Sequence, residues 1–240
     1  MEIKPIDETH FMIYEENVID TEIKSKISSI ANLIDSQDHP AIISVTPSYR
    51  SIMVTYDVLQ ITLEVLLDDL GLNNLKHDEL NSQQSKRLIT IPVAYGGAYG
   101  PDLNVVSNHA NLSEDEVIKL HTEPNYLIYA IGFLPGFPFL GGLNKQIFTP
   151  RKETPRSKIV QGSVGIANNQ TGLYPKSSPG GWQIIGRTPI DVFNLDRNPM
   201  ILYEAGDYIA FKAISNEEFD NIEKEINDGR FDYRQLVGEL

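Results

Sequence analysis

Apolar residues near the start of the chain change from strand-like to helix-like spacing. Short apolar runs at residues 3–6 and 11–14 are typical of strands. After Asp20, which we expect to cap a helix, apolar residues recur three and four positions apart, at Ile23, Ile27, Ile30, Ala31 and Ile34. The pattern predicts an amphipathic helix that stops before Pro40.

The next pattern predicts a hairpin, a second helix and a strand. Residues 41–46 and 52–56 are apolar runs joined by a short polar turn. An apolar helix over residues 59–70 and a strand over residues 86–93 follow. The order strand, helix, two strands, helix, strand predicts a small ferredoxin-like α/β domain, which we assign to residues 1–85.

Glycine and proline become frequent in the second part of the chain, and the apolar runs shorten. Asp102 is expected to cap a short helix, and Ser113 with Glu116 has the spacing of a capping box. Apolar runs between turn signals predict strands at residues 126–131, 163–167, 182–186, 200–203 and 208–213. Residues 86–240 are therefore expected to form a compact barrel or sandwich with a C-terminal helix, which makes the protein α+β.

Composition and charge narrow the class of protein. The 240 residues are 41% hydrophobic and 22% charged, as in ordinary globular proteins. A formal net charge of -13 disfavours binding to nucleic acid and to anionic membranes. The chain contains no cysteine, which excludes disulfides and thiolate chemistry. Because we find neither a signal segment nor an apolar run long enough to span a bilayer, we expect a cytoplasmic protein.

Residues 132–143, Gly-Phe-Leu-Pro-Gly-Phe-Pro-Phe-Leu-Gly-Gly-Leu, combine fixed and permissive backbone positions. Proline fixes φ and removes a donor, while glycine permits left-handed backbone. We therefore expect a rigid loop rather than a strand of a ladder. Its phenylalanines, Phe137 among them, either plug the core, line a pocket or meet a partner protein.

Polar candidates for ligand binding follow this segment. Two Thr-Pro-Arg units end at Arg151 and Arg156, and Arg187 comes later. The guanidinium fork suits carboxylates and phosphates, although solvated surface arginines are the alternative.

Residues 162–175 interleave glycine with neutral donors and acceptors. Ser163, Gln170 and Tyr174 suit an amide or a phosphate, but no Walker A sequence closes the stretch, and a β-hairpin is the alternative. Trp182 either packs in the core or leaves its indole N–H for a ligand.

His121 is a candidate for proton transfer near neutral pH. An isolated histidine is more often a structural hydrogen-bonding residue, so both interpretations stay open. The other histidines lack the spacing of metal ligands, and no protein metal site is predicted.

Together, residues 132–143, the two Thr-Pro-Arg units, residues 162–174 and residues 179–188 resemble the family that contains the B subunits of 5-oxoprolinase and the KipI proteins. The family is also described as carboxyltransferase or allophanate hydrolase subunit 1. The resemblance implies an N-terminal α/β domain followed by a cyclophilin-like β-barrel. It also implies one component of an ATP-dependent 5-oxoprolinase, which cleaves 5-oxo-L-proline to L-glutamate.

The resemblance further implies partners and a nucleotide. These are a C-type chain (subunit 2), an A-type lactam-utilisation chain, and ATP with Mg²⁺ as its counter-ion, held by this chain or by a partner. Self-association is also compatible with the family. The alternatives are a KipI-like inhibitor of a sensor histidine kinase, a carboxyltransferase-type subunit of a urea or allophanate pathway and, from the fold alone, a prolyl isomerase.

On the enzyme hypothesis, three side chains take catalytic roles. His121 transfers protons, while Arg156 and Arg187 stabilise phosphate and carboxylate groups. The substrate pocket is predicted to use Arg151, Ser163, Gln170, Tyr174, Trp182 and Phe137.

Overall fold

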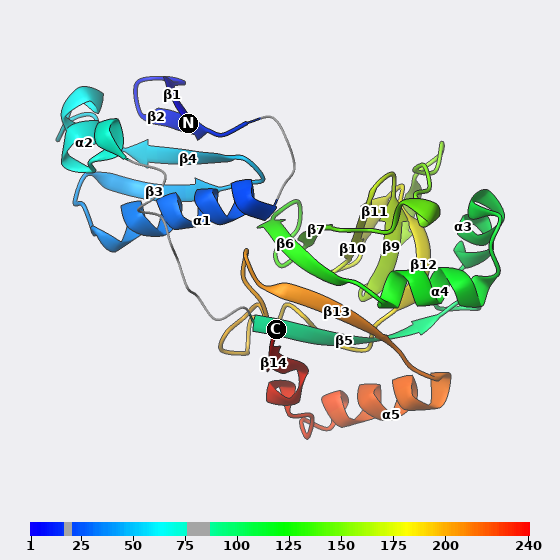
Figure 1. The fold of residues 1–240 in the computed structure, drawn as a ribbon. Coiled ribbons are helices and arrows are strands. Elements are labelled where there is room, and N and C mark those ends of the chain that lie inside the picture. The colour runs from blue at the N-terminus through cyan, green and yellow to red at the C-terminus, as the bar shows by residue number, and fades with distance from the viewer. Residues whose placement is uncertain (17–20, 76–86) are drawn as a thin grey trace. The chain divides into compact units, whose positions relative to one another are not determined.

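The computed structural model describes residues 1–16, 21–75 and 87–240 (Figure 1). The chain divides into two compact units, Met1–Gln84 and Ser85–Leu240, here called unit 1 and unit 2. The predicted cap Asp20 and the predicted domain boundary between residues 85 and 86 lie outside the described residues. Each unit has a hydrophobic core of its own.

Unit 1 is an antiparallel sheet with helices packed against it. The strand order is β1-β2-β4-β3. Its elements are β1 (Glu2–Pro5), β2 (His10–Tyr14), α1 (Thr21–Ser36), β3 (Ile42–Pro47), β4 (Ser51–Tyr56), α2 (Leu63–Asp69) and the short 3₁₀ helix η1 (Leu72–Asn74). The apolar residues predicted at helical spacing are confirmed as the inner face of α1, where Ile27, Ile30 and Ile34 are fully buried. They pack in one cluster with Phe11 and Ile13 of β2.

The ferredoxin-like arrangement expected for this unit is not confirmed. It requires the strand after α2 to return to the same sheet, but that strand, β5 (Arg87–Tyr95), pairs within unit 2. The place beside β2 is taken by β1, in register from Glu2↔Tyr14 to Pro5↔Phe11. Apolar spacing predicts where a strand lies, but the choice of its partner depends on long-range packing that local spacing does not encode.

Unit 2 is built on a closed β-barrel. The hydrogen-bonded order is β12-β9-β10-β7-β6-β13-β5, and β12 also pairs with β5, which closes a seven-stranded barrel. Besides β5, the barrel strands are β6 (Asn125–Ile131), β7 (Pro138–Gly141), β9 (Ser163–Ala167), β10 (Gln170–Leu173), β12 (Gln183–Arg187) and β13 (Tyr208–Ala213). The closed barrel fits the cyclophilin-like expectation.

Part of residues 132–143 forms a barrel strand, so the expectation of a loop outside any ladder is wrong. β7 pairs with β6, and its Leu140 lies opposite Thr171 of β10. Proline is tolerated in β7 because Pro138 opens the strand. The turn before it carries Phe133 and Gly136 at positive φ values of 67° and 81°. The strand predicted at residues 200–203 is likewise reduced to an isolated bridge at Ile201.

Three of the described helices pack on the barrel: α3 (Leu103–Ala110) on β12, α4 (Glu114–Thr122) on β13 and α5 (Asn216–Asn227) on β5. The capping box predicted for Ser113 and Glu116 is confirmed at the start of α4, where Ser113 N donates to the Glu116 carboxylate at 2.8 Å. The remaining elements are η3 (Lys145–Ile147), β8 (Arg156–Ile159), β11 (Ser178–Gly180), η4 (Tyr233–Leu236) and β14 (Val237–Glu239).

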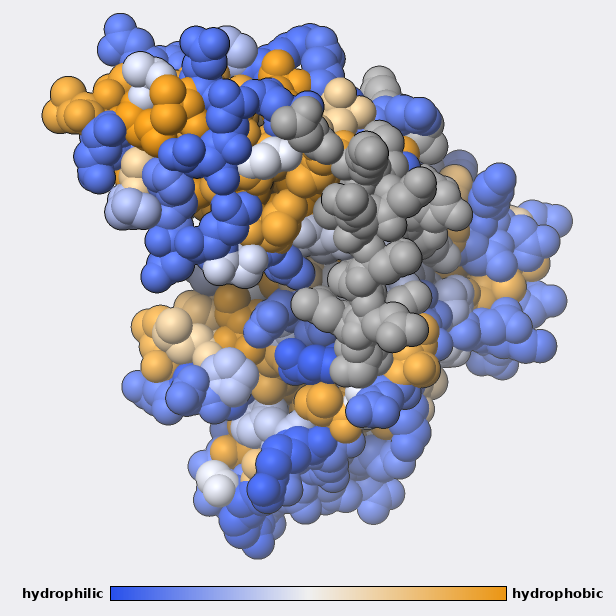
Figure 2. Space-filling view, turned by 60° about the vertical axis from the view of Figure 1, so that its left-hand side comes forward, coloured by the Kyte–Doolittle hydropathy of each residue, from blue (hydrophilic) through white to orange (hydrophobic). Residues whose placement is uncertain are grey.

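Polar residues predominate on the face of the molecule that Figure 2 shows. Figure 2 shows apolar side chains gathered on part of unit 1. The exposed large apolar residues include Ile43 and Leu59 in unit 1, and Phe133 and Leu195 in unit 2. Such side chains are common on protein surfaces and by themselves identify no partner. Within the described residues, no helix combines the length and the apolar character that a membrane crossing needs.

Candidate functional site

The segment that carries the two Thr-Pro-Arg units is fastened to unit 2 by backbone hydrogen bonds. Thr149 exchanges two of them with Asn168, at 3.3 and 2.7 Å, and Lys152 N donates to Gly181 O at 2.7 Å. Arg151 is exposed, whereas Arg156 begins β8 and is partly buried. The two arginines therefore have different surroundings despite their similar sequence context.

Arg156 is held by Asp102, a buried carboxylate at the start of α3. Arg156 Nη2 donates to Asp102 Oδ1 at 2.6 Å, and Lys152 Nζ lies 3.5 Å from the same oxygen. Asp102 Oδ2 accepts a hydrogen bond of 2.7 Å from the backbone N–H of Ile184 in β12. Sequence spacing predicts a capping side chain at Asp102, but the carboxylate instead joins α3 to β8 and β12.

The surroundings of Asp102 keep its carboxylate ionised. Burial opposes ionisation, but the hydrogen bonds from Arg156 and from the Ile184 N–H, together with the charges of Arg156 and Lys152, outweigh it. The pKa of Asp102 therefore lies below its usual value. At neutral pH this carboxylate neutralises one of the two adjacent cations and fixes the position of the Arg156 guanidinium.

Gln183 lies next to this network in the chain, as the neighbour of Ile184 in β12. Its Nε2 donates to Pro150 O at 3.0 Å, and the residue is only 6% exposed. Among the described residues, neither Gln183 Oε1 nor Arg156 Nη1 has a hydrogen-bond partner, although both atoms are buried. We call these two atoms the open pair. Leaving a buried polar atom unsatisfied costs ~1–3 kcal/mol, so each such atom requires an explanation.

Three of the predicted pocket residues pack against one another. The Phe137 ring lies edge-on to Tyr174 and Trp182, with centroids 5.3 and 5.6 Å apart. Burial raises the pKa of Tyr174 to about 12, so its phenol stays protonated at neutral pH. The guanidinium carbon of Arg151 lies 5.9 Å from the centre of the Trp182 ring. Of the alternatives that the sequence leaves open, packing in the core fits Phe137 and Trp182. Arg151 extends this aromatic cluster to the surface.

His121 belongs to a second buried network. Its Nδ1 lies 2.8 Å from Tyr95 Oη, and its Nε2 lies 2.7 Å from Thr171 Oγ1. Thr171 Oγ1 donates to Gly165 O at 3.1 Å, so it accepts from His121 Nε2–H, and Tyr95 donates to Nδ1. The imidazole also stacks on Phe211, with ring centres 4.7 Å apart.

This second network holds a neutral imidazole. Burial lowers the pKa of His121 to about 3, and its relative exposure is 0%. Tyr126 Oη donates to His121 O at 2.7 Å and fixes the end of α4. Because both ring nitrogens are engaged inside the core, the geometry favours a structural role for His121 over the proton transfer predicted from sequence.

The structure does not bring the remaining predicted residues into the Asp102 network. Arg187 Nε donates to Gln161 O at 3.0 Å, and its guanidinium lies 5.5 Å from the Phe219 ring of α5. Ser163 lies opposite Arg187 in the β9–β12 ladder, and Gln170 opens β10. These positions favour roles in holding the barrel and α5 together.

Asp102, Lys152 and Gln183 are members of the site that the sequence analysis did not select for it. Asp102 follows Gly-Pro at a helix start, which is the pattern of an ordinary cap. Lys152 follows Arg151 directly, so a search for charge clusters could have included it. Gln183 carries no local signal, because its role depends on β12 lying beside both α3 and residues 149–156.

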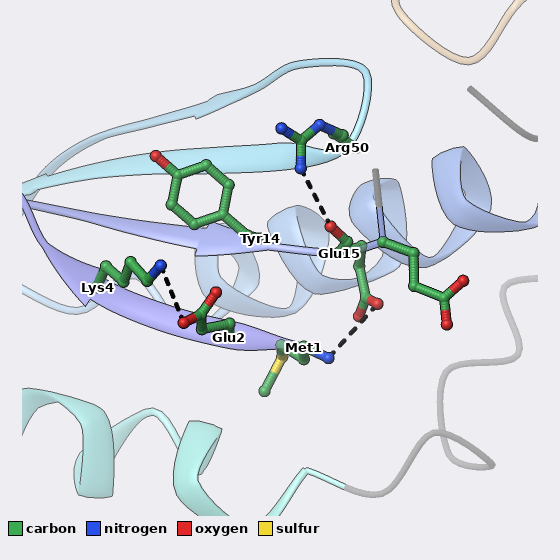
Figure 3. A pocket seen from close by; sticks show the side chains of 7 residues that line it. Met1, Glu2, Lys4, Tyr14, Glu15 and Arg50 are labelled. Atoms are coloured by element: carbon green, nitrogen blue, oxygen red, sulfur yellow. Dashed lines mark hydrogen bonds and ion pairs between the residues drawn. The ribbon is translucent and has the colours of Figure 1, made fainter. Parts of the chain in front are cut away.

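A hollow of about 530 Å³ lies in unit 1 and contains none of the predicted site residues. It is lined by Met1, Glu2, Lys4, Tyr14, Glu15, Glu16 and Arg50 (Figure 3). Two of its cations have carboxylate partners within the hollow: Lys4 pairs with Glu2 at 2.9 Å, and the Met1 amine with Glu15 at 3.5 Å. These internal pairs give no reason to place the chemistry here rather than around Asp102.

Comparison with known proteins identifies the family. Residues 1–203 match the family described as carboxyltransferase domain, subdomain C and D. The B subunit of 5-oxoprolinase from Bacillus subtilis (strain 168) is 38% identical over 236 residues, which cover 94% of this chain and 98% of that protein. The chain belongs to the family of 5-oxoprolinase B subunits. Another member, from Escherichia coli O157:H7, is 41% identical over 175 residues, covering 72% of this chain and 79% of that protein.

Solved structures share the fold within longer chains. The crystal structure of TTHA0988 matches with a TM-score of 0.76 at 29% identity, covering 86% of this chain and 40% of that chain. The urea amidolyase of K. lactis matches with a TM-score of 0.76 at 17% identity, covering 99% of this chain and 16% of that chain. This chain therefore spans less than half the length of these two solved proteins, and the second likeness concerns the fold alone.

Proposed function

We propose that this chain is the B-type component of an ATP-dependent 5-oxoprolinase, acting in the cytoplasm with partner subunits to open 5-oxo-L-proline to L-glutamate. The observation that carries the proposal is the 38% identity to the B subunit of a 5-oxoprolinase over nearly the full length of both chains. The Asp102 network supports it, because it combines cations with an uncharged acceptor and a directional donor.

The chemistry of a lactam explains the need for such a site. Amide resonance makes the ring carbon a poor electrophile, so attack by water is slow. If the amide oxygen attacks the γ-phosphorus of ATP, ADP leaves and the oxygen becomes a phosphate ester. Water then adds to the activated carbon, and the C–N bond breaks as the nitrogen takes a proton, which leaves a γ-glutamyl phosphate. A second water hydrolyses this acyl phosphate to L-glutamate and phosphate. This series of reaction steps requires cations for phosphate and carboxylate groups and neutral hydrogen-bonding groups for the amide.

The described residues support placing ATP mainly on a partner. Residues 95–102 form a glycine-rich turn before α3, but the buried Asp102 carboxylate lies at that helix start and Glu114 Oε2 comes near Gly96. Negative charge at a helix N-terminus disfavours a phosphate there. The described residues also contain no group of three His, Asp or Glu side chains that could hold a metal ion. We propose that Mg²⁺ is held by the nucleotide phosphates, and that Arg151 and Lys152 are the cations this chain offers to phosphate or carboxylate.

A urea-type substrate is the second candidate. It is favoured by a urea amidolyase of Lachancea kluyveri that is 27% identical over 248 residues, although these make up only 13% of that protein. Inhibition of a histidine kinase stays a prediction without a supporting contact among the described residues.

Reconstitution tests the proposed function. The full chain is mixed with C-type and A-type subunits, and glutamate release from 5-oxo-L-proline is followed with and without ATP. We expect release only when this chain, both partners and ATP are all present. Release that is equally fast without this chain, or no release in any combination while urea is consumed, would contradict the proposal.

A further inference from the structure

The open pair consists of one donor, which belongs to the Asp102 network, and one acceptor on Gln183, the neighbour in β12 of the Ile184 that donates its N–H to Asp102. Arg156 Nη1 can only donate a hydrogen bond, and Gln183 Oε1 can only accept one. Both belong to side chains already fixed by their other ends: Arg156 by Asp102 at 2.6 Å, and Gln183 by Pro150 O at 3.0 Å. The ladder position of Gln183 adds a constraint, since the next residue, Ile184, donates its N–H to the same Asp102.

This combination of donor and acceptor selects the chemistry of a ligand. A carboxylate or phosphate has only acceptors, so it would satisfy Arg156 Nη1 and be repelled by Gln183 Oε1. An ammonium group has only donors, so it would satisfy Gln183 Oε1 and be repelled by Arg156. Asp102 also pairs with Arg156 at 2.6 Å, and its negative charge weakens any simple attraction of Arg156 for anions.

We propose that the open pair recognises the edge of a cis amide, with Arg156 Nη1 donating to the carbonyl oxygen and Gln183 Oε1 accepting from the adjacent N–H. In a small lactam the ring forces C=O and N–H onto the same side, and urea presents the same edge. Choosing a lactam carboxylate as the ligand rests on the proposed function. Arg151 and Lys152, on the same segment, then supply positive charge for its carboxylate.

Recognition of an amide edge by this pair also has a mechanistic consequence. A hydrogen bond from Arg156 to the carbonyl oxygen withdraws electron density from the ring carbon. Gln183, by accepting the N–H, fixes which face of the ring is presented. Both atoms are buried, so binding requires residues 150–155 to move. Contacts that hold this segment include Lys152 N to Gly181 O at 2.7 Å, Gln183 Nε2 to Pro150 O at 3.0 Å and Lys152 Nζ to Asp102 Oδ1 at 3.5 Å.

The test pairs a change in the ligand with a change in the protein. Binding of 5-oxo-L-proline, its N-methyl derivative, L-proline and urea to the full chain is measured by calorimetry. The same ligands, as substrates or competitors, are compared through KM and Ki in the reconstituted assembly. We expect N-methylation of the lactam to weaken binding at least tenfold in the unmodified protein. In Gln183→Met the parent lactam should bind at least tenfold more weakly, and N-methylation should then make no further difference.

Two control variants and the choice of ligands make the outcomes decisive. Gln146→Met makes the same chemical change at an exposed site in η3, and Arg234→Lys alters an exposed arginine; both should bind as the unmodified chain does. Arg156→Lys should reduce lactam affinity with folding intact, as judged by circular dichroism. Tighter binding of urea than of the lactam would support recognition of an amide edge, with a urea-type compound as the substrate.

Three results would overturn the inference. One is that Gln183→Met discriminates between the lactam and its N-methyl derivative as strongly as the unmodified chain, which is the outcome expected if the open pair holds only structural water. Another is that L-proline binds as well as the lactam. A third is that no lactam binds to the chain alone or in the assembly. If the assembly releases glutamate but Gln183→Met still distinguishes the lactam from its N-methyl derivative, the proposed function stands and the amide site is wrong. If Gln183→Met loses this distinction but no assembly releases glutamate, the amide site stands and the proposed function is wrong.

Discussion

Two buried polar networks in unit 2 contrast in how their atoms are satisfied. Around His121, the imidazole nitrogens, the Tyr95 and Thr171 hydroxyls and the Tyr126 hydroxyl have hydrogen-bond partners within the described chain. Around Asp102, the network is less enclosed, and the open pair of Arg156 Nη1 and Gln183 Oε1 lies in and beside it. One network is closed on itself, and the other still has a donor and an acceptor available.

The contrast suggests that the two networks differ in role, one in stability and the other in function. A fully satisfied polar network inside a core stabilises one arrangement and is costly to disturb. A network with unsatisfied atoms sacrifices stability, and such a sacrifice is typical of sites that bind something else. On this argument, the contacts of His121, the histidine that looks most catalytic in the sequence, favour a structural role, whereas Gln183, which no motif indicates, is the residue proposed to bind.

The largest effect is expected from removing the centre of the closed network. His121→Ala leaves the Tyr95 hydroxyl without its partner, removes one of the two partners of the Thr171 hydroxyl and creates a cavity against Phe211. We expect the free energy of unfolding of unit 2 to fall by ~3–4 kcal/mol, measured by urea denaturation. His109→Ala, at an exposed histidine of α3, is the control and should change it by less than ~0.5 kcal/mol. A loss below ~1 kcal/mol in His121→Ala would remove the distinction between the two networks.

The next effect is a pH dependence that belongs to the closed network. The pKa of His121 is about 3 in the folded protein, against an ordinary value of 6.5, so below pH 6.5 the unfolded chain binds a proton that the folded chain does not. Stability therefore falls as the pH falls, by ~2 kcal/mol between pH 7.5 and 5. The lowered pKa of Asp102 acts in the same direction, but only below about pH 4.

Denaturation curves at several pH values provide the measurement for this dependence. His121→Gln cannot titrate, so its free energy of unfolding should be nearly level between pH 7.5 and 5. A decline of the same size in His121→Gln and in the unmodified protein would assign the effect to the other histidines.

A pair of similar substitutions compares the networks directly. Thr171→Val keeps the shape of the side chain but leaves His121 Nε2–H without an acceptor, which should cost ~1–2 kcal/mol. Gln183→Met removes an oxygen that belongs to the open pair and one bond to Pro150 O, so it should cost less than ~1 kcal/mol. Thermal unfolding of both variants tests the order. If Gln183→Met is the more damaging of the two, Gln183 is a structural residue.

The smallest effect is expected at the exposed edge of the aromatic cluster. Arg151→Ala removes a cation lying 5.9 Å from the Trp182 ring at an exposed position, and should change the free energy of unfolding by less than ~0.5 kcal/mol. The fluorescence of Trp182, the one tryptophan in the chain, should nevertheless shift. An unchanged spectrum, or a loss of more than ~1 kcal/mol, would show that Arg151 has a different role.

Local sequence patterns predicted much of the architecture. The helical spacing from Ile23 to Ile34, the capping box at Ser113 and Glu116, and the short runs that became β6, β9, β12 and β13 all depend on neighbours within a few residues. The same local view was wrong where distant partners decide the outcome. β7 became a strand because β6 and β10 offer it backbone partners on both sides, although its sequence is rich in proline and glycine.

The site shows the same division. Sequence by itself determined the family resemblance, the cationic segment around Arg151 and Arg156, and the aromatic residues that pack beside it. Only the tertiary structure decided that Asp102 binds Arg156 and that Gln183 binds Pro150 O, while His121 is enclosed elsewhere. The physical reason is that these hydrogen bonds join groups 50 or more residues apart in the chain, as Asp102 and Arg156 are, and only the packing of α3 and β8 in the folded unit brings them within reach.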